Sequence, residues 1–136
     1  MRDLVAKLLA RYLKMSADSL DHEIGEVDYV GNAKDIVSRL ERRDSFNMNA
    51  AKNLLEQAIE NDDEIEGYDT GVPANEENIK TASLVLGGAI NLHTGIVLGK
   101  VHSIEEAVSY LGGIPEDSVF AFEENQDGCI EISMAI

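Results

Sequence analysis

The chain has 136 residues, of which 44% are hydrophobic and 5% aromatic, and its formal net charge is −15. This length and composition are typical of one globular domain with a core of Leu, Ile, Val and Ala, and they exclude a disordered chain. No apolar run approaches the ~18 residues of a membrane span, and the charges near the start are unlike a signal peptide. Because Cys129 is the single cysteine, no internal disulfide can form, and we expect a cytoplasmic setting.

The negative charge is confined to the C-terminal part of the chain. Residues 1–52 hold nine acidic and nine basic side chains, whereas residues 53–136 hold 17 acidic side chains against only Lys80 and Lys100. Such a surface repels phosphate backbones and disfavours nucleic acid as a partner. Basic proteins fit as partners, although an acidic excess also serves solubility alone.

Apolar residues at helical spacing predict three helices in the first half of the chain. The first covers residues 2–15 and is basic and amphipathic. We expect it to pack on its own domain, and docking on a membrane or in a partner's groove is the alternative. Residues 16–31 are polar and predict a loop. The second helix covers residues 33–40 with Asn32 as its cap, and the third begins at Asn47 or Asn49.

An acidic, turn-rich segment of residues 61–78 follows, and Gly and Pro residues predict a surface loop or linker there. Its spacing places Asp62, Glu64 and Glu66 at the first, third and fifth positions of a calcium loop. The twelfth position is then Pro73, where the loop requires a glutamate, so the calcium template fails. The single domain is thus divided into a helical part (1–61), an acidic loop (62–80) and a sheet-containing part (81–136).

Two apolar runs with neighbouring glycines predict two buried strands, at residues 81–89 and 95–101, joined by a tight connection at residues 92–95. A capping box formed by Ser103 and Glu106 then starts a short helix that reaches residue 111. A third strand at residues 118–123 and an alternating last strand up to Ile136 flank the turn Asn125-Gln126-Asp127-Gly128. This turn predicts an antiparallel hairpin, since Asp-Gly tolerates a positive φ.

Sites for catalysis, cofactors or metals find little support in the sequence. Both glycine-rich phosphate-loop patterns are absent, and we expect no cofactor. His93 and His102 lack the further ligands that zinc requires, and no spacing pairs Cys129 with a histidine. If the protein is an enzyme, the polar groups to examine are His93, His102 and Glu105.

The order of these segments resembles the C-terminal part of the tubulin/FtsZ family. Residues 26–31 look like the family's acidic loop, with Asp28 on an acidic position, although Glu26 and Gly31 depart from the family's residues. Residues 53–59 are similar to the helix before the C-terminal sheet, and residues 83–88 look like the first strand of that sheet. Residues 103–107 and 119–136 resemble its helix and its closing hairpin. The GTP-binding half is absent, so the resemblance implies an assembly module without its own GTPase site.

These observations predict an α+β domain with about four strands in an antiparallel or mixed sheet, helices mainly on one face, and a helical N-terminal half. The function expected first is a non-enzymatic protein-interaction or assembly domain that binds a protein partner or itself through Glu26, Asp28, Tyr29 and the acidic face. The alternative is a small oligomeric enzyme or ligand-binding protein with its site at a subunit junction.

Overall fold

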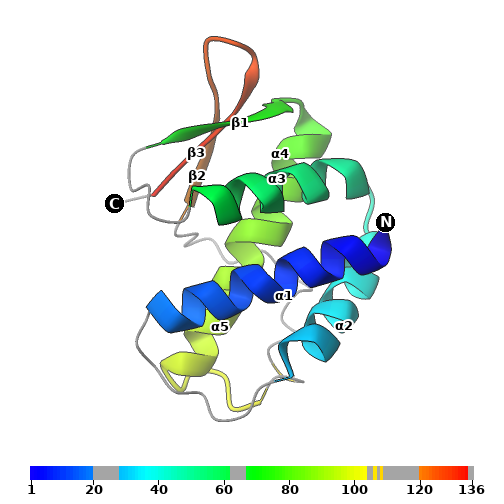
Figure 1. Ribbon diagram of the computed structural model, residues 1–136, viewed down its shortest axis with the longest axis vertical. Coiled ribbons are helices and arrows are strands. Elements are labelled where there is room, and N and C mark those ends of the chain that lie inside the picture. The colour runs from blue at the N-terminus through cyan, green and yellow to red at the C-terminus, as the bar shows by residue number, and fades with distance from the viewer. Residues whose placement is uncertain (20–27, 62–66, 104–105, 107, 109–119, 135–136) are drawn as a thin grey trace.

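The structure is a computed structural model, and it describes residues 1–19, 28–61, 67–103, 106, 108 and 120–134. Helices form most of the body, and a three-stranded antiparallel sheet lies at one end of it (Figure 1). The expected α+β class and helical N-terminal half are confirmed. The expected number of about four strands is wrong, since the sheet of the described residues has three.

The first helix is part of the core. Helix α1 (Arg2–Ser19) extends four residues beyond the expected end and contacts α2 (Tyr29–Glu41), α3 (Met48–Glu60) and α5 (Ala89–Val97). An ion pair of 2.6 Å between Arg2 Nε and Glu41 Oε2 joins the start of α1 to the end of α2. The inner face of α1 is buried, as expected for a helix that packs on its own domain, and it comprises Val5, Ala6, Leu9, Ala10, Tyr12 and Leu13.

Side chains of Asp28 and Asn47 cap the starts of α2 and α3. The expected cap Asn32 is wrong: α2 begins earlier, and Asp28 caps it by accepting a hydrogen bond from the Gly31 N–H at 3.0 Å. In α3, Asn47, one of the two expected starting positions, is the cap and accepts from the Ala50 N–H at 3.1 Å. The inner face of α3 is apolar, with Ala50, Ala51, Leu54, Leu55 and Ala58 buried and Ile59 half-buried.

The largest correction concerns the two strands expected at residues 81–89 and 95–101. The structure instead forms one uninterrupted helix, composed of α4 (Glu76–Ala82), a π-helical segment η1 (Ser83–Gly88) and α5, and residues 98–101 form the turn that follows it. The residues expected to make a tight connection at 92–95 lie inside α5. We call the whole stretch the central helix, because α4 and η1 contact α3 while α5 contacts α1 (Figure 1). Residues 84–90 are all buried, so they are apolar or small on every side of the helix. The sequence therefore lacks the alternation of polar and apolar residues that indicates a helix.

The sheet contains one strand that the sequence analysis missed. Strand β1 (Tyr68–Pro73) lies in the segment expected to be a loop, and α4 begins there too. Its side chains alternate between inside and outside, with Thr70 and Val72 buried. The Thr70 hydroxyl donates to the Ile130 carbonyl at 2.8 Å and accepts from the Val72 N–H, which ties β1 to its neighbour.

The C-terminal hairpin is confirmed. Strands β2 (Phe120–Glu124) and β3 (Cys129–Met134) pair antiparallel, and β3 lies in the middle of the order β1-β3-β2. The inward residues Ile130 and Ile132 are 0% and 1% exposed. The expected parts of these strands at residues 118–119 and 135–136 lie outside the described residues, as does most of the helix expected after Ser103. The Glu106 N–H does donate to the Ser103 hydroxyl at 3.0 Å.

Candidate functional site

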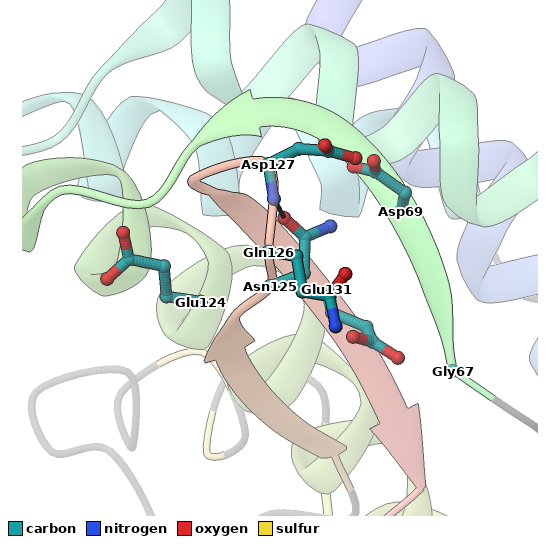
Figure 2. Close-up of a pocket in the computed structure, with 7 residues that line it drawn as sticks. All are labelled: Gly67, Asp69, Glu124, Asn125, Gln126, Asp127 and Glu131. Atoms are coloured by element: carbon teal, nitrogen blue, oxygen red, sulfur yellow. Dashed lines mark hydrogen bonds between the residues drawn. The ribbon is translucent and has the colours of Figure 1, made fainter.

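The sheet carries an open groove that is lined by acidic and amide side chains. The groove has a volume of about 570 Å³ and runs between the outer face of β1 and the β2–β3 turn (Figure 2). Its lining residues come from segments more than 50 positions apart in the sequence, and they are Gly67, Asp69, Glu124, Asn125, Gln126, Asp127 and Glu131. Four of the seven are carboxylates, and none is basic.

The β2–β3 turn is organised by the hydrogen bonds of one side chain. The Asn125 Oδ1 atom accepts hydrogen bonds from the N–H groups of Asp127 and Cys129, both at 3.0 Å. The Gly128 N–H donates to the Asn125 carbonyl, and Gly128 has a φ of 75°, which glycine adopts at little cost. This turn therefore holds Asp127 at the rim of the groove.

Strand β1 supplies the opposite carboxylate. Asp69 is paired with Glu131 of β3, and its Oδ1 atom accepts from the Gly71 N–H at 2.8 Å. Figure 2 shows the carboxylates of Asp69 and Asp127 pointing toward each other, while Glu124 points away from both. The pKa of the nearby Cys129 thiol is raised by burial and, secondarily, by the negative charges of Asp69 and Asp127. Like charges that face each other in this way repel, and an incoming positive group relieves the repulsion.

The groove carboxylates do not converge on a single point. In the described parts of the chain, no three His, Cys, Asp or Glu side chains are grouped so that they could hold a metal ion. The carboxylates are spread along the groove and point in different directions (Figure 2). This arrangement fits an extended partner that carries several positive charges.

The residues that the sequence analysis named lie elsewhere. Asp28 is exposed and caps α2, as described above, while Glu26 lies outside the described residues. Tyr29, the first residue of α2, is half-buried against the core, and its pKa is raised by burial and by the charge of Asp18. The ring centroids of Tyr29 and His93 are 6.4 Å apart. Tyr29, named for protein interaction, therefore lies beside His93, named for the alternative enzymatic or ligand-binding function.

The two histidines have different surroundings. His93 lies in α5 and is only 7% exposed, and its Nε2 atom has no hydrogen-bond partner within the described structure. Burial lowers the pKa of His93, so its imidazole is neutral at pH 7. His102 is exposed, and its backbone N–H donates to Glu106 Oε2 at 3.2 Å. Glu105 lies outside the described residues. A neutral imidazole with a free nitrogen can accept or donate one hydrogen bond, and it can bind a metal.

The acidic half of the chain was predictable from the sequence, but the groove residues were not. The signal available was the charge count of residues 53–136, which gives no position. Asp69 was assigned to a loop, and only the pairing of β1 with β3 brings it opposite the turn.

No described helix is long and apolar enough to cross a membrane.

Comparisons with known proteins give no relative for this chain. No family model matches the sequence, and neither the curated proteins nor the solved structures contain a significant match.

Proposed function

We propose that this chain is a non-enzymatic protein-interaction domain whose acidic groove binds a basic segment of a partner protein. The observation that supports the proposal is the grouping of Asp69, Glu124, Asp127 and Glu131 around one groove that has no basic lining residue. Three strands and a hydrogen-bonded turn hold these carboxylates, so little order must be created on binding. The net charge of −15 attracts a basic partner over a distance and raises its association rate.

Binding of a Lys- and Arg-rich peptide, measured by fluorescence anisotropy, tests this proposal. The double variant Asp69→Asn with Glu131→Gln removes two groove charges, and the amide oxygen introduced at position 69 can still accept from the Gly71 N–H. Each lost charge should weaken binding about two- to fivefold, as expected for partly exposed ion pairs worth roughly 0.5–1 kcal/mol. Affinity for the peptide should also fall as salt rises.

A matched control separates the groove from general negative charge. The variant Asp44→Asn with Glu60→Gln removes two exposed carboxylates that do not line the groove. It should leave peptide binding nearly unchanged at the same salt concentration. Equal weakening in both variants would show that the peptide binds the acidic surface at large, and the proposed site would then be rejected.

An assembly function related to tubulin/FtsZ proteins is a narrower form of this proposal. One of the segments behind that resemblance, residues 83–88, is π-helical here and not a strand. Co-sedimentation of the chain with polymers of an FtsZ-like protein tests the narrower form. Its absence, together with intact peptide binding, would leave the groove as a docking site for other proteins.

His93 supports the second candidate function, a ligand-binding or enzymatic site completed by a second subunit. A buried imidazole without a partner is uncommon and marks a position that needs an explanation. Light scattering gives the oligomeric state, and NMR of the His93 ring shows whether its Nε2 atom gains a hydrogen bond in an oligomer. A monomer whose His93 ring is unaffected by protein concentration would argue against this candidate.

A further inference from the structure

The central helix contains an unusual element at its midpoint. Between α4 and α5, residues Ser83–Gly88 form hydrogen bonds in the π pattern, although the flanking residues Ala82 and Ala89 have ordinary α-helical dihedral angles. A π-helical turn holds more residues than an α-helical turn and is frequent at functional sites. This segment is buried except for the half-buried Ser83, so it lies inside the core and not at a surface.

The same helix also carries the buried polar atoms that lack partners. Within the described residues there are three such side-chain atoms, and all three are on the central helix: Asn78 Oδ1, Asn91 Nδ2 and His93 Nε2. Two of them lie on α5, directly after the π-helical segment. Buried polar groups without hydrogen bonds are costly, so the orientation of α5 seen here does not suit its own polar side chains.

We propose that the central helix switches between two registers. In the register seen here, the π-helical segment holds one additional residue in its turn, and in the other register the segment is α-helical. Conversion of Ser83–Gly88 to α-helical geometry would rotate α5 relative to α4 by the angle of one residue, about 100°. Each side chain of α5 then takes the direction that the following residue has now. This inference is independent of the acidic groove.

The consequences of this rotation can be followed residue by residue. His93 takes the half-buried direction of Thr94, where water reaches its ring, and Leu92 takes the buried direction of His93 beside Tyr29. An apolar side chain suits that position better than an imidazole with a free nitrogen. Against this gain, Asn91 takes the buried direction of Leu92. Each register thus buries a polar side chain that the other leaves half-buried. The two registers can therefore have similar free energies, as a switch between them requires.

The far end of α5 permits such a movement. Leu98, which follows α5, is 60% exposed, and the N–H groups of Lys100 and Val101 both donate to the Gly95 carbonyl. The turn after α5 is therefore fastened to α5 itself, and the rotation carries with it Val101, which is half-buried against the core. Register shifts of helices occur on the microsecond to millisecond timescale.

NMR relaxation dispersion and saturation transfer on the methyl groups of Ile90, Leu92 and Ile96 test the proposal. The full chain should show one shared exchange process at these three residues. Deletion of Gly88 removes the additional residue, which leaves α5 in its present orientation within a regular α-helix. The deletion variant should lose the exchange and keep the contact between the Tyr29 and His93 rings.

A second variant covers the case in which the deletion variant fails to fold. In His93→Leu, an apolar side chain occupies the position beside Tyr29, which favours the register seen here and should suppress the exchange at least severalfold. Leu98→Ala, at an exposed position beyond α5, is the control and should leave the exchange unchanged. The proposal is overturned if the full chain shows no exchange at these methyl groups, or if the exchange persists in folded His93→Leu.

Discussion

At the scale of single residues, one hydroxyl connects two parts of the helical body. Thr81 of α4 is 0% exposed, and its Oγ1 atom accepts a hydrogen bond from the Asn47 N–H at 3.0 Å. The same hydroxyl lies 2.9 Å from the Glu77 carbonyl and 3.3 Å from the Ser45 carbonyl, to either of which it can donate. The start of α3 is thereby fixed to α4 through a group that water does not reach.

Replacing Thr81 with Val tests this connection, because Val has nearly the same shape and no hydroxyl. The Asn47 N–H then loses its partner, and we expect the free energy of unfolding to fall by about 1–3 kcal/mol in urea denaturation. Thr81→Ser keeps the hydroxyl and should lose about 1 kcal/mol or less, for the missing methyl group. If Val is tolerated as well as Ser, the hydrogen bond contributes nothing to stability.

His93 predicts a particular dependence of stability on pH. Its pKa in the folded protein is lowered from 6.5 by burial, so the unfolded chain binds a proton more readily than the folded one. The stability that neutral His93 allows is therefore present above pH 6.5 and is lost as the pH falls from there toward the lowered folded pKa. The loss is limited to about 1.4 kcal/mol per pH unit for one proton.

Comparison with His93→Leu isolates this proton from the carboxylates, which titrate in both proteins. The difference in unfolding free energy between the two should stay constant from about pH 8 to pH 7. It should shift in favour of the Leu variant as the pH falls from about 6.5 to 5. A difference that is independent of pH would mean that His93 is as easily protonated in the folded protein as in the unfolded chain.

At the scale of elements, those with a clear period were predictable from the sequence, and those whose period is absent or concealed were missed. The faces of α2 and α3 and the hairpin β2–β3 were predictable because buried and exposed positions alternate in them. Residues 84–90 are buried on all sides, and an apolar run without a period fits a strand and a buried helix equally well. In β1 the alternation was present, but Gly71 and Pro73 concealed it, and such residues are tolerated at a sheet edge.

The hairpin turn makes the stability of the groove depend on one amide. Asn125→Ala removes the acceptor of two backbone N–H groups. We expect the free energy of unfolding to fall by about 1–2 kcal/mol, since each such bond contributes roughly 0.5–1.5 kcal/mol. Peptide affinity should fall too, because Asp127 is no longer held in place. The control is Gln126→Ala, at the exposed neighbouring position, which should change the free energy of unfolding by less than about 0.5 kcal/mol. A similar loss of stability in both variants would refute the role of Asn125.

At the scale of the whole molecule, the net charge is distributed unevenly between the two parts of the chain. Residues 1–52 are neutral in sum and form α1, α2 and the start of α3, whereas the sheet lies in the part that carries the net charge of −15. The charge count alone predicted which half is acidic. It could not predict that β1 brings Asp69 toward Asp127, nor that Tyr29 and His93 meet, because both depend on contacts between segments more than 50 residues apart.

This concentration of charge predicts that salt stabilises the fold. Repulsion among the groove carboxylates is greatest at low ionic strength and is screened as the Debye length falls from about 30 Å at 0.01 M to about 3 Å at 1 M. The melting temperature should therefore rise by a few degrees with added NaCl, which corresponds to about 1 kcal/mol.

Asp69→Asn with Glu131→Gln should be more stable than the natural sequence at low salt and should gain less from added salt. Asp44→Asn with Glu60→Gln, with the same net charge, should retain most of the natural salt dependence; if both double variants respond to salt alike, the repulsion is spread over the whole surface and the groove is not its centre.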